Sequence, residues 1–92
     1  MPDVDVDGPN ELLARTERSR QEALANARQH MDLAEKLEAQ AQAAMQALGP
    51  RVRYGGGTYQ ERRLYTRAVA TKARMAQVYE LAAADVKRLE RM

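Results

Sequence analysis

Apolar residues recur along two long stretches of this chain at intervals of three, four and seven residues. Such spacing places side chains on one face of an α-helix, whereas a half-buried strand would alternate apolar and polar positions. The pattern therefore predicts two long amphipathic helices. Their apolar faces are formed by Leu13, Leu24, Ala27, Met31, Ala34, Leu37, Ala41, Met45 and Leu48 in the first stretch, and by Leu64, Ala68, Met75, Val78, Ala82, Val86 and Leu89 in the second.

The ends of the first helix are indicated by proline and glycine. Pro9 suits the first position of a helix, and Glu11 falls in its first turn, where the helix dipole favours negative charge. No glycine or proline follows until Gly49-Pro50, which is the usual order of residues just past a helix end. We therefore expect a helix over 9–48, preceded by a flexible acidic tail over 1–8.

The connection and the second helix follow. Residues 49–57 contain three consecutive glycines and are expected to form the turn. Thr58 and Glu61 have the spacing of a capping box, in which each side chain accepts a hydrogen bond from the other residue's backbone N–H. A second helix is thus predicted over 58–91. The expected fold is all-α, two long antiparallel helices forming a hairpin over 9–92.

Folding the helices back on each other suggests a register. If Leu48 lies near Leu64 across the turn, Ala27 lies near Val86 at the far end. The second helix would then end opposite about Arg20. The first part of the longer helix would extend beyond its partner.

The composition limits how well such a hairpin can shield itself from water. Hydrophobic residues make up 45% of the 92 residues, but 17 of them are alanine and none is Phe or Trp. Small domains are marginally stable and usually need disulfides, a metal or a partner. Cysteine is absent and His30 is the single histidine, which excludes disulfides and the usual zinc sites. Completion by oligomerisation or by another protein is therefore predicted.

The sequence also argues against catalysis. His30 lies at the edge of the apolar face, where a packing or surface role is the ordinary one, although a general base or pH sensor is the alternative. Glu35 and Glu38 lack the Glu-x-x-His spacing of di-iron bundles, and the glycine run lacks the Lys-Ser/Thr of a phosphate loop. We expect no enzyme activity and no catalytic, cofactor or metal residues.

Neither a membrane span nor a signal peptide is visible. No apolar run approaches the roughly 20 residues that cross a bilayer, and the first residues are acidic rather than basic and apolar. A soluble protein, cytoplasmic or associated with an assembly, is expected.

Charge is divided unevenly between the two halves of the chain. Residues 1–50 carry nine acidic and five basic side chains, a net of −4, and residues 51–92 carry four acidic and ten basic, a net of +6. Arginines and tyrosines gather around the turn, and apolar residues off the main stripe offer a second surface: Leu33, Val69, Tyr79 and Leu81. The residues predicted to bind a partner are Leu12, Leu13, Arg51, Arg53, Tyr54, Tyr59, Arg62, Arg63 and Arg67.

Protein association is the function that these observations favour, for example as a small structural subunit of a phage or bacterial assembly. Nucleic-acid binding is the main alternative, because arginines neutralise phosphates and tyrosines stack on bases.

A further alternative comes from Tyr54-Gly55-Gly56 followed by Tyr59-Gln60. Two helices around this turn resemble the small hairpin proteins secreted by type VII systems, a family named for its Trp-x-Gly turn. The resemblance implies a secreted hairpin in which Tyr54 stands where that family has tryptophan.

Overall fold

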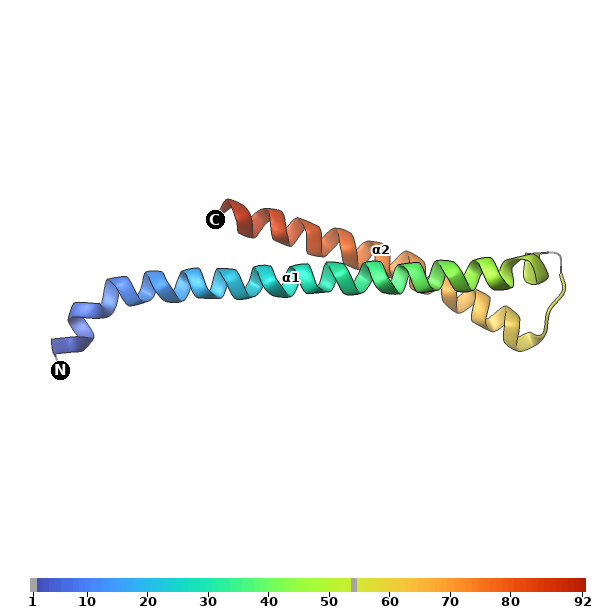
Figure 1. Ribbon diagram of the computed structural model, residues 1–92, viewed down its shortest axis with the longest axis horizontal. Helices are drawn as coiled ribbons and strands as arrows, with labels where there is room; N and C mark the ends of the chain where they lie inside the picture. The colour runs from blue at the N-terminus through green and yellow to red at the C-terminus, as the bar shows by residue number, and fades with distance from the viewer. Residues whose placement is uncertain (1, 54) are drawn as a thin grey trace.

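The chain forms two helices that pack antiparallel in the computed structural model (Figure 1). Helix α1 comprises Pro2–Arg53 and helix α2 comprises Tyr59–Arg91. The structure describes the backbone of residues 2–53 and 55–92, and the side chains of residues 15–52 and 55–92. Within these ranges there is no strand, and the predicted all-α hairpin is confirmed.

The hairpin is a thin rod. It measures 76 × 24 × 13 Å and has a radius of gyration of 21.9 Å. A compact domain of this length would have a radius of gyration of about 12 Å. The two helices therefore have each other as their main packing surface, and most of each helix faces outward.

Packing at the open end of the hairpin follows the expected register. Leu24 and Ala27 form one buried cluster with Val86 and Leu89, with Ala23 and Met31 packed against it. The guanidinium of Arg20 donates a hydrogen bond to the carbonyl oxygen of Leu89 at 3.2 Å. The predicted proximity of Ala27 to Val86, and the end of α2 opposite Arg20, are thus confirmed.

Small residues dominate the contact between the helices. The residues at the contact, buried and half-buried together, follow alternating spacings of three and four along each helix, and methionines and tyrosines are among the half-buried ones. A seven-residue repeat of this kind keeps one line of residues on each helix against its neighbour, and we call this line the seam. Most of the buried set is alanine: Leu24, Ala27, Ala34, Ala41, Ala68, Ala82, Val86 and Leu89.

Helix α1 does not end at Gly49-Pro50, as the sequence suggested, but continues to Arg53. Gly49 is buried within the helix, where an added Cβ would lie 3.6 Å from Cε2 of Tyr65. A Cβ at this position would make an ordinary contact with α2, and Gly49 lies within α1 and does not cap it. Pro50 removes one helical hydrogen bond, a loss that the helix tolerates near its end.

The actual end of α1 uses the next glycines. Gly55 has a positive φ of 78° and donates its N–H to the carbonyl of Val52 at 3.1 Å. Gly56 donates its N–H to the carbonyl of Arg51 at 2.9 Å. These two bonds are those of a Schellman motif, which satisfies carbonyls left unpaired at a helix end.

The predicted capping box at the start of α2 is confirmed. The Glu61 N–H donates to the Thr58 hydroxyl at 3.1 Å, and the Thr58 N–H donates to the Glu61 carboxylate at 3.0 Å. The same carboxylate accepts a bond from Nη1 of Arg51 at 2.9 Å. One glutamate thus joins the cap of α2 to the last turn of α1.

At the other end, α1 begins at Pro2, so the residues expected to form a tail belong to the helix. Proline is accepted at the first helical position, and an acidic sequence near a helix start suits the dipole. Because α2 ends level with Arg20, the preceding part of α1 extends beyond it (Figure 1).

Arg20 also binds Glu17 through two hydrogen bonds of 2.7 and 3.2 Å, and Gln21 adds a third of 3.1 Å. These bonds, led by those from Arg20, lower the pKa of Glu17 to about 2. Glu17 thus orients the guanidinium that caps the last turn of α2, where a cation is favoured by the helix dipole.

We predict that acid weakens this end of the hairpin. An unfolded glutamate has a pKa of about 4.3, above the folded value, so the contribution of Glu17 to stability is complete above that pH. It is lost progressively as the pH falls toward about 2. Between about pH 5 and pH 2, the melting midpoint measured by circular dichroism should fall less in Glu17→Gln than in the wild-type protein. Glu22→Gln serves as the control, and an equal change in both variants would contradict the role of Glu17.

Candidate interaction surface

Four apolar side chains gather on one side of the hairpin near its middle. In antiparallel helices with a seven-residue repeat, equivalent flanking positions of the two helices meet on the same side. This spacing and the observed register place Leu33 and Leu37 of α1 beside Val78 and Leu81 of α2. Leu33 is 53% exposed and Leu81 is 66% exposed, whereas Leu37 and Val78 are half-buried. We call these four residues the apolar flank.

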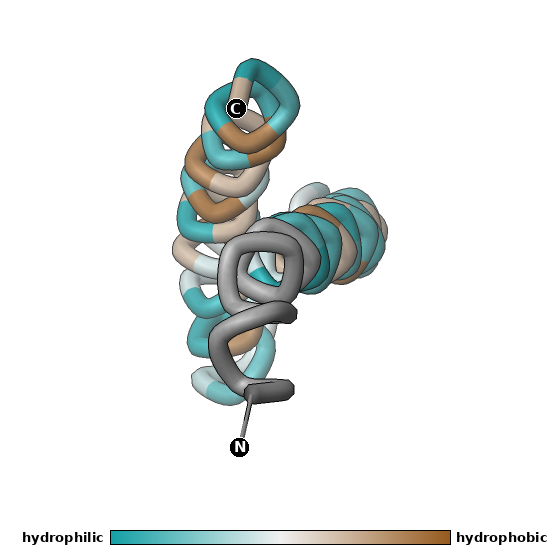
Figure 2. The backbone as a smooth tube through the Cα atoms, turned by 90° about the vertical axis from the view of Figure 1, so that its left-hand side faces the viewer, coloured by the Kyte–Doolittle hydropathy of each residue, from teal (hydrophilic) through white to brown (hydrophobic). Residues whose placement is uncertain are grey.

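The apolar flank has arginines along its margin. Arg67, Arg74 and Arg88 are exposed and recur on α2 at the same heptad position as Leu81. Figure 2 shows apolar segments recurring along the helices between hydrophilic ones. An apolar centre with arginine around it is a composition found in protein interfaces.

Toward the turn, Leu64 continues this side of α2. It is 52% exposed, so the prediction that Leu64 belongs to the seam between the helices is wrong. The next residue, Tyr65, occupies the seam and packs beside Gly49. The physical reason is the small residue at Gly49, since a side chain larger than alanine would compete with the Tyr65 ring for this space.

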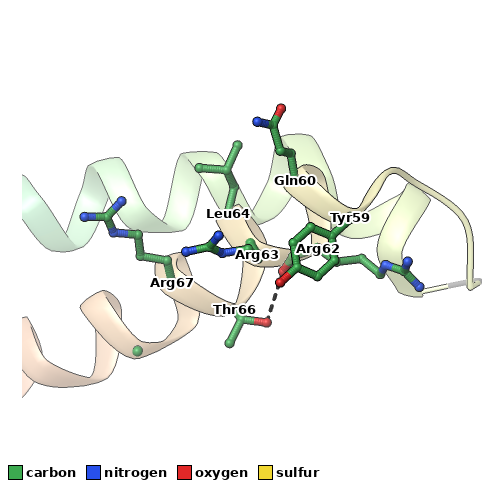
Figure 3. Close-up of a pocket in the computed structure, with 8 residues that line it drawn as sticks. Tyr59, Gln60, Arg62, Arg63, Leu64, Thr66 and Arg67 are labelled. Carbon is green, nitrogen blue, oxygen red and sulfur yellow. Dashed lines mark hydrogen bonds between the residues drawn. The ribbon is translucent and has the colours of Figure 1, made fainter.

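A shallow groove runs along the first turns of α2 (Figure 3). The guanidinium carbon of Arg63 lies 5.9 Å from the centre of the Tyr59 ring, a cation–π contact that holds two groove residues together. Thr66 donates its hydroxyl to the carbonyl of Arg62 at 3.0 Å and so faces its own backbone. We call this feature the arginine groove; its lining is Tyr59, Gln60, Arg62, Arg63, Leu64, Thr66, Arg67 and Ala70.

The arginine groove carries excess positive charge. Nearby Glu61 is already engaged, because the Thr58 backbone N–H and then Arg51 stabilise its charged form and lower its pKa. The ion pairs found among residues 15–52 and 55–92 do not include the three groove arginines. Arg62, Arg63 and Arg67 are exposed and are available to an acidic ligand.

The structure brings together part of the predicted partner-binding set. Tyr59, Arg62, Arg63 and Arg67 share the groove, whereas Arg51 is paired with Glu61. Among the residues proposed for a second surface, Leu33, Val69 and Leu81 are exposed and Tyr79 is half-buried. The other residues predicted to bind a partner, Leu12, Leu13, Arg53 and Tyr54, have side chains outside the described part of the structure.

Sequence reasoning missed Arg20 and the wall of the groove made by Gln60 and Leu64. Arg20 occupies a position of the seven-residue repeat that faces the other helix. A charged residue at such a position, with Glu17 one helical turn before it, was the sequence signal for this contact. Gln60, Leu64 and Arg67 follow one another at helical spacing, so a helical wheel of α2 would have placed them together.

The described residues include one histidine and several acidic side chains. His30 is exposed, and over residues 15–52 and 55–92 there is neither a buried polar side chain nor a group of three acidic or histidine residues that could hold a metal. A membrane-spanning helix is likewise not found in the part of the chain that the structure describes.

No family model, curated protein or solved structure matches this chain.

Proposed function

We propose that this hairpin acts by protein–protein association and that the apolar flank is its main contact. The observation that carries the proposal is that several large apolar side chains are exposed, whereas most of the buried apolar side chains are small. Large apolar side chains, Leu33 and Leu81 foremost, face outward, while five of the eight buried apolar residues that the structure describes between the helices are alanine. Exposed apolar patches with a polar margin are typical of association sites.

The total surface supports the proposal. The chain exposes 7445 Å², whereas a compact monomer of 10.3 kDa would expose about 5,400 Å². The difference of about 2,000 Å² is comparable to the area that a standard protein interface buries. A partner along the rod would therefore bring the hairpin to the burial expected of a stable domain.

In this proposal the seven-residue repeat makes the hairpin one half of a coiled-coil or four-helix arrangement. A homo-oligomer and a subunit of a phage or bacterial assembly both fit that arrangement. A secreted type VII-like hairpin would use the same helical contacts.

The test substitutes the two most exposed residues of the apolar flank. We expect Leu33→Glu/Leu81→Glu to weaken association at least about tenfold, because it places carboxylates in an interface that would bury leucine. Sedimentation equilibrium over a range of concentrations measures the effect on self-association. Ala39→Glu/Ala84→Glu, which alters two exposed alanines outside the flank, is the matched control. Equal association constants for the two variants would remove the apolar flank from the account.

Nucleic-acid binding is the second candidate, favoured by the excess charge of the arginine groove. Cations along a groove give salt-dependent binding without sequence preference. However, Arg63 lies over the Tyr59 ring, so one face of the aromatic side chain is already in use. Fluorescence anisotropy with a single-stranded oligonucleotide tests this candidate, and no binding at low salt would eliminate it.

A further inference from the structure

The arginine groove lies at one end of the rod, and the most acidic part of the sequence belongs to the other end. The groove is on the first turns of α2, beside the turn, whereas α1 begins at the opposite end of a molecule 76 Å long (Figure 1). The first eleven residues contain Asp3, Asp5, Asp7 and Glu11 and no basic side chain. One chain therefore cannot bring its own acidic and basic ends together.

The acidic end also belongs to the part of α1 that has no helix beside it. Arg20 contacts the last turn of α2, so residues 2–19 extend beyond the paired part of the hairpin. At 1.5 Å per residue this extension is about 27 Å long, longer than the roughly 18 Å spanned by residues 59–70 along α2. The extension is thus long enough to cover the whole arginine groove.

We propose that the arginine groove binds the acidic extension of α1 from a second copy of this chain, in an antiparallel dimer. This inference rests on the proposed function and names its partner. Two hairpins lying side by side in opposite directions place each acidic extension on the other copy's groove. The two contacts are related by a two-fold axis, so the assembly closes at two chains.

The apolar residues fit the same arrangement. Full overlap of the two rods puts the two-fold axis near the middle of α1, within about 8 Å along the rod of Leu33 at 1.5 Å per residue. The apolar flank then lies close to the axis, where both copies contribute to one contact. On this overlap residues 12–13 of the extension reach the level of about residue 70, at the far end of the arginine groove.

Charge reversal at each end provides the test, with the full chain throughout. We expect the basic-end variant, Arg62→Glu/Arg63→Glu/Arg67→Glu, to self-associate at least about tenfold more weakly than wild type, because like charges then meet at both contacts. The acidic-end variant, Asp3→Lys/Asp5→Lys/Asp7→Lys, should be weakened similarly. An equimolar mixture of the two variants should dimerise again, because every contact in the mixed dimer pairs opposite charges.

The matched control is Arg28→Glu/Lys87→Glu/Arg91→Glu, which makes the same charge change at three exposed residues outside both the arginine groove and the margin of the apolar flank. It should keep wild-type self-association, and mixing it with the acidic-end variant should leave that variant without full-strength dimers, because one of the two end contacts would still join like charges. Circular dichroism on each variant establishes that helicity is retained. Sedimentation equilibrium at low and moderate salt gives the association constants.

Failure of the mixture to dimerise, or wild-type self-association in both end variants, would overturn the second copy as the occupant of the groove. Oligonucleotide binding that the basic-end variant loses, together with unchanged self-association, would assign the groove to nucleic acid and also overturn it. In either case the proposed function survives if Leu33→Glu/Leu81→Glu abolishes association. The two proposals can therefore fail separately.

Discussion

Leu24→Ala is expected to destabilise the hairpin by about 2–4 kcal/mol, the usual cost of deleting a buried leucine side chain. Leu24 is 3% exposed and belongs to the buried cluster with Val86 and Leu89. Most of the other buried residues between the helices are alanine, so few contacts can compensate for this loss. Because total stability in a domain of this size is only a few kcal/mol, most of the helicity should disappear at room temperature. Far-UV circular dichroism with urea titration measures the change.

The control for Leu24 is Val69→Ala, at a residue that is 41% exposed on α2. Exposed truncations of this kind usually change stability by less than about 0.5 kcal/mol. Equal losses from the two substitutions would contradict the burial described for the seam.

Pro50→Ala is expected to stabilise the hairpin by about 1–3 kcal/mol, because proline within a helix costs up to about 3 kcal/mol relative to alanine. The expectation depends on α1 continuing to Arg53. If the helix ended at Leu48, Pro50 would lie in the turn, and its replacement by alanine would leave stability unchanged or slightly lower. Urea unfolding midpoints of the two proteins distinguish these cases.

Two glycine substitutions also test where α1 ends, because they are expected to change stability in opposite directions. Gly49→Ala should stabilise by about 0.5–1 kcal/mol, because the added methyl meets Tyr65 at an ordinary contact distance of 3.6 Å. Gly55→Ala should destabilise by about 1 kcal/mol, because φ is 78° at that position. The reverse order of stability would place the end of α1 at Gly49.

The sequence predicted the helices and their register well, because spacing and capping are local properties. Apolar intervals of three and four require only helical geometry, and the capping box requires only Thr58 and Glu61. The contact of Ala27 with Val86 followed from bringing the two stripes together. These features depend little on the details of packing.

The end of α1 could not be predicted in the same way. Gly49-Pro50 and Gly55-Gly56 both carry the composition of a helix end. What distinguishes them is tertiary packing, since Gly49 is buried within α1 beside Tyr65, whereas Gly55 has a positive φ and ends the helix. The same contact moves the seam by one residue and leaves Leu64 exposed.

The candidate site was predictable in part. Arginine clustering identified the basic end, and apolar residues off the main stripe identified Leu33 and Leu81. The groove itself depends on which α2 side chains point away from α1, and the engagement of Arg51 by Glu61 depends on how the chain turns between the helices. Composition alone therefore could not predict the groove or the Arg51–Glu61 ion pair.

We propose that one hairpin buries too little apolar surface to be the functional unit. The concentration dependence of thermal melting tests this proposal, since association stabilises the folded chain by mass action. We predict a melting midpoint that rises steadily as the chain concentration is raised from about one to several hundred micromolar. A sharp transition at one unchanged midpoint, from a species that stays at 10.3 kDa throughout, would contradict it.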